Sequence, residues 1–392
     1  MNKERARRVM ERKGLDCLVA TSRENVHYST GFDSFLKQVN PLTPVFGVWS
    51  GEGSGAPTLV TSYSESDAVV AGRIGAESVR LYGSFPLVLS EKGLSPIEKE
   101  LLELCRLGAS PDPVSAVASA LRDAGADSSR IGIDETGLPY GMLEKIRAAL
   151  KEAKSVEPAA AVFREIRSVK TEEEISKLRE VVRVTEGAMK GSMELAKPGS
   201  TTSKIVQAVN EFEVAEGARP TFTVVGSRNI GAFPNAPGDD EVLRSGDLVR
   251  YDVGCNLNGY CSDLGRTLAI GRPPAQVSRL YRATLAGLEA ALDQVRAGVK
   301  ASEIFRTAVN EVRSRGIKHY QRHHVGHGIG MEVYDPPSIS ETDDTVLEEG
   351  MVINLETPYY ELGVGGLIVE DCLVVRGRGY DLLSKLSRRL SR

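Results

Sequence analysis

The chain of 392 residues is longer than most single domains, which have about 100–200 residues, and two domains are therefore expected. Its apolar fraction of 41% and charged fraction of 26% are those of an ordinary globular protein, which excludes a disordered, collagen-like or coiled-coil chain. The formal net charge of −4 provides no positive field that would attract nucleic acid or an anionic membrane. We expect neither as a partner.

The amino-terminal residues MNKERARRVMERKG are rich in Arg and Lys and lack the apolar stretch of a signal peptide. No segment approaches the roughly 18 consecutive apolar residues of a membrane span. The five cysteines are scattered and never spaced C-x-x-C, so reduced and mostly buried thiols are expected at Cys17, Cys105, Cys255, Cys261 and Cys372. These features predict a soluble, cytoplasmic protein.

Residues 1–160 are predicted to form an α/β domain, because helical patterns alternate there with short apolar strands. A helix ending at Lys13 is followed by a strand over residues 16–20, and further helices are expected over 114–124 and 141–151. This domain contains no recognisable catalytic constellation.

A second domain, residues 161–392, is predicted to begin shortly after Glu157-Pro158. Thr171 and Glu174 have the spacing of a capping box, which marks the start of a helix that should end before Pro198-Gly199.

The elements expected in the rest of the chain are a helix from Ser200 or Thr201, strands between 222 and 267, helices over 275–296 and 301–316, and further strands to Val375. The Arg-rich end, residues 384–392, is expected to be a solvated tail or helix end.

The segment LVRYDVGCNLNGYCSDLGRT predicts two strands joined at Asn258-Gly259, the dipeptide favoured in type I′ turns. With a two-residue turn Gly254 faces Asp263, and Asp252 is the diagonal neighbour of Asp263. With a four-residue loop Asp252 faces Asp263 directly. Both registers place the two carboxylates on one face, where a metal ion would relieve their repulsion. Two solvent-facing Asp residues beside a turn are the alternative.

The segment RHHVGHGIGMEVYDPP contains His323, His324 and His327, with glycines beside His327 that allow a close approach. A dinucleotide-binding loop is excluded because no strand-to-helix context accompanies these glycines. Glu356 ends the strand MVINLE, and Glu370 lies in the apolar strand GLIVEDCLVV, where an unpaired carboxylate is costly to bury. Taken singly, the histidine could be structural and Glu370 could belong to a buried ion pair.

Together, four carboxylates and one imidazole suit a pair of divalent metal ions. We expect Mn²⁺ or Co²⁺, with Zn²⁺ or Fe²⁺ as alternatives. The candidate ligands are Asp252, Asp263, His327, Glu356 and Glu370. A metal ion that lowers the pKa of a water molecule towards about 7 supplies the nucleophile for hydrolysis.

The order Asp-x₁₀-Asp, GHGIG, Glu and then Glu in an I-V-E-D strand resembles the pita-bread metallopeptidases, which include prolidase, aminopeptidase P and methionine aminopeptidase. The segment NVHYSTGF, residues 25–32, resembles the creatinase/prolidase N-terminal domain, which methionine aminopeptidase lacks. The resemblance covers nearly the whole chain. It implies a creatinase/prolidase-like α/β domain followed by an α+β pita-bread catalytic domain, the five metal ligands above and a homodimer.

The chain departs from this family at three positions. Peptidases of the family have a His at the position of Asn235 and another at that of Tyr334, and often a substrate-binding Arg at that of Ile368. His323 matches a His of the prolidase and aminopeptidase P site. By resemblance Glu356 is the general base, while Asn235, Tyr334 and His323 are candidate donors to the oxyanion.

Three hypotheses follow. The first is a prolidase-like metallopeptidase that cleaves a dipeptide or short peptide. The second retains the metal centre but hydrolyses a non-peptide C–N compound, as creatinase and ectoine hydrolase do with this fold, and the three departures favour it modestly. The third is a non-enzymatic binding module, which the complete set of metal ligands disfavours.

Overall fold

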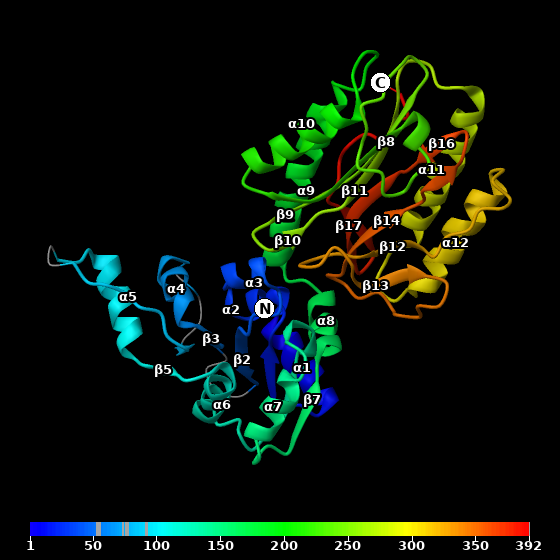
Figure 1. Ribbon diagram of the computed structural model, residues 1–392. Helices are drawn as coiled ribbons and strands as arrows, with labels where there is room; N and C mark the ends of the chain where they lie inside the picture. Colours follow the sequence, from blue (N-terminus) through cyan, green and yellow to red (C-terminus); the bar gives the residue numbers. More distant parts are fainter. Residues whose placement is uncertain (52–55, 73, 75–77, 91–92, 392) are drawn as a thin grey trace. The chain divides into compact units, whose positions relative to one another are not determined.

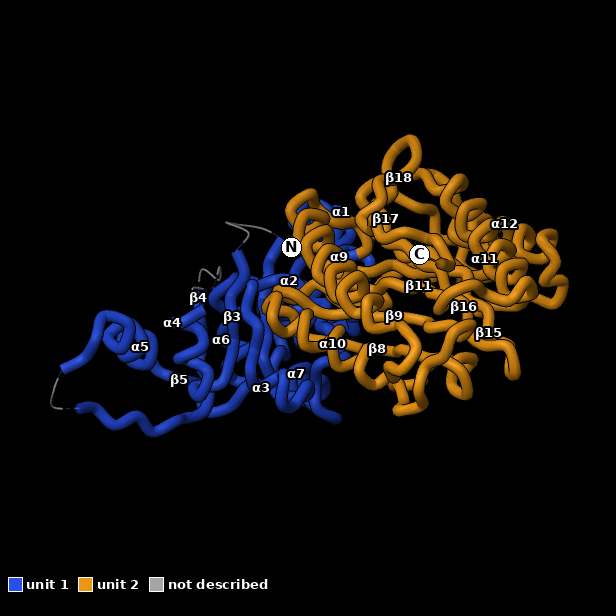
Figure 2. The backbone as a smooth tube through the Cα atoms, turned by 90° about the horizontal axis from the view of Figure 1, so that it is seen from above, with its two compact units in different colours: residues 1–167 blue, residues 168–392 orange. Residues whose placement is uncertain are grey.

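The computed structural model describes residues 1–51, 56–72, 74, 78–90 and 93–391 (Figure 1). The chain divides into two compact units, residues 1–167 and 168–392 (Figure 2). Among the described residues, none of the helices is both long enough and apolar enough for a membrane span.

Unit 1 is built on a seven-stranded mixed sheet in the order β5-β4-β3-β2-β1-β6-β7. Its strands are β1 (Cys17–Ala20), β2 (Phe46–Ser50), β3 (Thr58–Ser62), β4 (Ser78–Tyr82), β5 (Ala109–Ser110), β6 (Arg130–Ile133) and β7 (Ser155–Pro158). Its helices are α1 (Lys3–Lys13), α2 (Arg23–Thr30), α3 (Phe35–Val39), α4 (Ser66–Gly72), α5 (Pro96–Arg106), α6 (Pro113–Asp123), α7 (Met142–Ala149) and α8 (Ala160–Ser168). The predicted α/β architecture is confirmed.

Unit 1 ends at residue 167, in the last turn of α8, whereas the sequence placed the boundary at 160. Helix α8 belongs to unit 1 because its polar groups bond to α1 and α2. Arg167 donates from Nη1 to Asn25 Oδ1 at 2.7 Å, and Arg5 donates from Nε to the Glu165 carbonyl oxygen at 3.0 Å.

Unit 2 begins with two helices whose starts follow the sequence signals. Helix α9 (Glu172–Met193) is preceded by the capping box, in which Thr171 Oγ1 accepts from Glu174 N and Glu174 Oε2 accepts from Thr171 N. Thr201 caps α10 (Thr202–Ala215). Two later helices, α11 (Ala275–Gln294) and α12 (Ala301–Ser314), also lie where they were predicted.

Two larger sheets and one small hairpin complete unit 2. In the first sheet β9 (Leu248–Leu257) pairs with β8 (Arg219–Ser227) on one side and with β10 (Tyr260–Cys261) and β11 (Leu264–Ala269) on the other. The second sheet has the order β13-β12-β14-β17-β18, formed by β12 (His324–Gly328), β13 (Asp335–Ser340), β14 (Val352–Glu356), β17 (Glu370–Arg376) and β18 (Gly379–Leu382). The hairpin pairs β15 (Tyr359–Glu361) with β16 (Gly365–Leu367).

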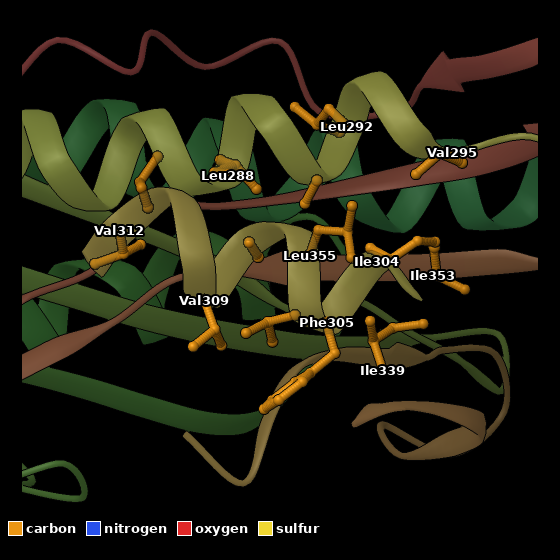
Figure 3. Packing of buried hydrophobic residues seen from close by; sticks show 14 of the residues in the cluster. Leu288, Leu292, Val295, Ile304, Phe305, Val309, Val312, Ile339, Ile353 and Leu355 are labelled. Atoms are coloured by element: carbon orange, nitrogen blue, oxygen red, sulfur yellow. The ribbon is translucent and has the colours of Figure 1, made fainter. Parts of the chain in front are cut away.

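Helices cover the sheets of unit 2, with α9 and α10 against β8 and β9, and α11 and α12 against the second sheet (Figure 1). Leu288 and Leu292 of α11 and Ile304 of α12 share an apolar core with Ile353 and Leu355 of β14 (Figure 3). Because side chains alternate along a strand, the residues between and beyond Ile353 and Leu355 face away from this core. These residues are Asn354 and Glu356, which lie beside Glu370 at the candidate site.

Candidate metal centre

The hairpin that carries the two aspartates has the two-residue turn. Leu257 pairs with Tyr260, and both turn residues have positive φ, 52° at Asn258 and 86° at Gly259, as a type I′ turn requires. Asp252 consequently pairs with Gly265 of β11 and is the diagonal neighbour of Asp263. The first of the two registers considered from the sequence is confirmed.

Gly265 leaves room for a carboxylate from the other sheet. A Cβ atom at this position would lie 2.6 Å from Ile368 Cδ1 and 2.9 Å from Glu370 Oε2, closer than real Cβ contacts. The absence of a side chain at Gly265 thus lets Glu370 approach the strand pair that bears Asp252 and Asp263.

The two glutamates face each other across the second sheet. Glu356, the last residue of β14, pairs with Glu370, the first residue of β17. Asn354, two residues before Glu356 on the same face, donates from Nδ2 to the Asp263 carbonyl oxygen at 2.8 Å and to Glu370 Oε1 at 3.0 Å. This amide joins the aspartate hairpin to the glutamate pair.

His327 reaches the same place from β12. It pairs with Asn354 of β14, and its Nε2 lies 3.5 Å from Asp263 Oδ2. Its Nδ1 lies 3.0 Å from the Gly328 carbonyl oxygen, a partner that would leave Nε2 free as a ligand atom. The ligand atoms of Asp263, His327 and Glu370 all lie within 4.8 Å of one another.

The register of β12 is irregular between His324 and His327. Three residues apart in a regular strand, these two side chains would project from opposite faces. In the structure both approach the cluster, because His324 Nδ1 lies 3.2 Å from Glu356 Oε1 and the two rings are 5.9 Å apart.

Burial is the largest influence on the titration of the four acids and raises the pKa of each. Repulsion from neighbouring carboxylates raises the pKa values of Asp252 and Glu370 well above the ordinary range. The pKa values of Asp263 and Glu356 are also raised, although the neighbouring His327 lowers both in part. Burial alone would lower the pKa of His327, but its hydrogen bond to Asp263 and the surrounding negative charge raise it. The folded chain therefore concentrates negative charge that a cation would neutralise.

Two arginines border the cluster. Arg250, fully buried, has Nη1 3.6 Å from Asp252 Oδ2. Arg322 has Nη2 3.7 Å from Glu356 Oε1. The Cζ atoms of Arg250 and Arg322 lie 5.3 and 5.9 Å from the centre of the Tyr360 ring. The cluster is thus acidic at its centre and basic along one border.

The predicted catalytic residues other than Glu356 lie in different surroundings. Tyr334 is 58% exposed, and its ring centre is 4.1 Å from that of His327. Asn235 is exposed, in a segment that Arg250 anchors by donating to the Phe233 and Pro234 carbonyl oxygens at 2.7 and 3.0 Å.

His323 and Ile368 also differ in their surroundings. His323 is exposed and lines a cavity of about 680 Å³ beside α12, rather than contacting the carboxylates through any described interaction. Ile368, two residues before Glu370, is 1% exposed. The histidine that approaches Glu356 is His324. Burial, with the positive charges of His327 and Arg322 as lesser causes, lowers the pKa of His324 to about 4.

The structure adds Arg250, Asn354 and Tyr360 to the site, none of which was predicted from the sequence. A signal for two of them was present, since Arg250 and Asn354 precede ligands Asp252 and Glu356 by two residues in apolar strands and so share their faces. Tyr360 had no comparable signal, because it lies in the short hairpin that follows β14.

The donor set fits divalent metal ions. Asp263, His327 and Glu370 offer oxygen and nitrogen atoms at mutual distances suited to one ion, and Asp252 and Glu356 add two more carboxylates beside them. Asp263 Oδ1 is buried and accepts no hydrogen bond from any described residue. A buried carboxylate oxygen in this state is stabilised when it coordinates a cation.

Comparisons with known proteins agree with this geometry. Residues 176–377 match metallopeptidase family M24, and residues 3–169 match the creatinase/prolidase N-terminal domain. A Xaa-Pro dipeptidase from Pyrococcus horikoshii is 32% identical over 260 residues, which are 65% of this chain and 73% of that protein.

Solved structures resemble the whole chain. The prolidase from Pyrococcus horikoshii OT3 is 25% identical and superposes with a TM-score of 0.77, covering 99% of both chains. A dipeptidase from Mycobacterium ulcerans is 27% identical, with a TM-score of 0.78 and coverage of 100% of this chain and 96% of that chain. Taken with the matches along the sequence, these likenesses place the chain in metallopeptidase family M24, as a pita-bread peptidase that carries the creatinase/prolidase N-terminal domain.

Proposed function

We propose that this peptidase hydrolyses dipeptides or short peptides with two divalent metal ions, Mn²⁺ or Co²⁺ in preference to Zn²⁺ or Fe²⁺. The observation that carries the proposal is the convergence of ligand atoms of Asp263, His327 and Glu370, from three separate segments of the chain, within 4.8 Å of one another. Asp252 and Glu356 complete the proposed ligand set. The Xaa-Pro dipeptidase activity named for the Pyrococcus horikoshii relative supports a peptide substrate.

When bound, the ions would acidify a water molecule and polarise the scissile carbonyl group. Glu356 takes the proton of the attacking water as the new C–O bond forms and a tetrahedral oxyanion develops. It then delivers this proton to the leaving nitrogen as the oxyanion collapses and the amide C–N bond breaks. Arg322 Nη2 and His324 Nδ1 lie 3.7 and 3.2 Å from Glu356 Oε1.

Tyr334 is the preferred donor to the oxyanion among the three candidates. Its ring lies against that of the proposed ligand His327, whereas no described contact joins Asn235 or His323 to the proposed ligands. Burial and the neighbouring carboxylates raise the pKa of Tyr334, which keeps its hydroxyl protonated and able to donate.

A second candidate function is hydrolysis of a non-peptide C–N compound at the same centre. Ile368 favours it, because an apolar, buried side chain stands where family peptidases have a substrate-binding arginine. The retained ligand positions argue against a binding module without activity. We also propose a homodimer by resemblance, and a cytoplasmic location, which accords with the five free and buried cysteines.

The test is an Asp263→Asn variant, with Asp293→Asn as control because Asp293 is exposed on α11. Both proteins are assayed for bound metal by elemental analysis and for hydrolysis of a panel of dipeptides, tripeptides and small N-acyl amides. We expect Asp263→Asn to lose metal and hydrolysis together, while the control retains both. Full metal content and full activity in Asp263→Asn would overturn the proposed centre.

A further inference from the structure

Arg322 is a cation at the border of the carboxylate cluster whose hydrogen-bonding groups are not used within the described chain. Its side chain is 20% exposed, and its Nη2 lies 3.7 Å from Glu356 Oε1. No described residue accepts a hydrogen bond from its guanidinium group, and the buried Nε atom has no partner. A guanidinium group has five N–H donors, and covering them without acceptors is unfavourable. The group is therefore available to a ligand.

Arg250, the other arginine at the border, is already engaged. It is fully buried, and its Nη2 donates to two backbone carbonyl oxygens, those of Phe233 and Pro234. It positions the segment that contains Asn235. Arg322 thus remains the accessible guanidinium group beside the proposed catalytic glutamate.

Arg322 also lines a cavity of about 490 Å³ formed with the residues that follow Glu356. Tyr359 and Tyr360 contribute aromatic walls, and Arg322 is the single arginine or lysine among the lining residues, all of which are described. The one carboxylate that lines this cavity, Glu361, already has a partner, because its Oε2 accepts a hydrogen bond from the Tyr359 hydroxyl at 2.7 Å. The volume lies in the range of small-molecule sites.

These observations favour a small anionic ligand with one end at Arg322 and the other at the metal centre. A carboxylate matches the planar guanidinium fork with two parallel hydrogen bonds. Arg322 lies within 4 Å of Glu356, so a carboxylate bound there is close to the bond that Glu356 helps to break. Only a substrate that ends shortly after the scissile amide satisfies both contacts.

We infer that Arg322 binds the terminal carboxylate of the substrate and thereby selects dipeptides over longer or carboxyl-blocked peptides. The inference rests on the proposed peptide hydrolysis. Arg322 would then bind the carboxylate that Ile368, at the position of the family's arginine, cannot bind because its side chain is apolar.

The kinetic test compares Ala-Leu and Ala-Pro with their C-terminal amides, on protein loaded with Mn²⁺ and of measured metal content. Arg322→Gln should raise KM for the free dipeptides by about ten- to a hundredfold, the effect of losing one charged hydrogen-bonded contact. KM for the amides should change much less, so that the preference for free dipeptides over their amides falls. Arg322→Lys should recover part of the loss because it restores charge without the planar fork.

The matched control is Arg306→Gln. Arg306 is exposed on α12 and lines, together with Arg322, the cavity of about 680 Å³, but it does not line the 490 Å³ cavity. The control variant therefore removes the same charge without changing the 490 Å³ cavity. A loss in Arg322→Gln that is equal for dipeptides and amides, or no loss at all, would overturn the inference.

A second measurement uses no catalysis. Metal-free protein is titrated with N-acetylleucine and N-acetylleucinamide and followed by NMR. Preference for the free carboxylate, reduced in Arg322→Gln and kept in Arg306→Gln, supports the inference, whereas no preference in the unmodified protein overturns it. If no metal-loaded protein cleaves any peptide, the proposed function fails, and this titration still decides the role of Arg322.

Discussion

Replacement of Glu213 by Gln should make the protein less sensitive to alkaline pH. Glu213 lies in the last turn of α10 and is inaccessible to solvent, and neither of its carboxylate oxygens has a hydrogen-bond partner among the described residues. Burial raises its pKa from 4.5 to about 8. The pKa of Cys255 is raised to about 11, mainly because this thiol is buried and to a lesser extent because of the negative charge of ionised Glu213.

The sign of the effect follows from the raised pKa. The folded protein binds the Glu213 proton more tightly than the unfolded chain does, so the contribution to stability is complete below pH 4.5 and declines as pH rises to about 8. A difference of this size corresponds to about 5 kcal/mol, an upper value for the free energy lost across that interval. Glu213→Gln cannot ionise and should show no such decline.

The assay is denaturant unfolding at pH 5 and pH 8, with chelator present so that metal binding makes no contribution. Glu211→Gln is the control, because Glu211 is exposed on the same helix. We expect Glu213→Gln to be a few kcal/mol more stable than the unmodified protein at pH 8 and to have no such advantage at pH 5. If Glu213→Gln and Glu211→Gln depend on pH in the same way, the buried carboxylate is not the cause.

Two further predictions concern catalysis. Glu356→Gln should reduce turnover by about a hundred- to ten-thousandfold, the usual contribution of a general base, and unchanged turnover at matched metal content would remove Glu356 from that role. The unmodified enzyme should cleave Xaa-Pro dipeptides poorly, and combining Asn235→His, Tyr334→His and Ile368→Arg should raise kcat/KM for them by roughly ten- to a hundredfold. Xaa-Pro dipeptides as the fastest substrates of the unmodified enzyme, in a panel with non-proline dipeptides and small amides, would refute the second prediction.

The sequence predicted the local elements of the centre well because their signals are local. Asn258-Gly259 can adopt the positive φ values of a tight turn at little cost, and this alone sets the register that puts Asp252 and Asp263 on one face. The capping box at Thr171 and Glu174 likewise depends on residues three positions apart. Such features do not require knowledge of distant segments.

The carboxyl-terminal end shows where local signals fail. Its arginines predicted a solvated tail or helix end, but the described residues 384–391 form no helix, and Arg388 Nε donates to the buried Asp371 carboxylate at 2.5 Å. Arg266 of β11 pairs with the same carboxylate at 2.6 Å and donates to the Leu386 and Ser387 carbonyl oxygens. An ion pair between residues so far apart leaves no pattern in either segment.

The sequence by itself determined the hairpin, the helices and the kinds of residue that could hold metal, because these depend on neighbours within a few positions or on chemical type. Tertiary structure decided which further side chains border the proposed ligands. An irregular register in β12 brings His324, rather than His323, to Glu356. Pairing of strands far apart in the chain places Arg322 there as well. Strand pairing over such separations depends on the packing of the whole unit, which a linear pattern does not contain.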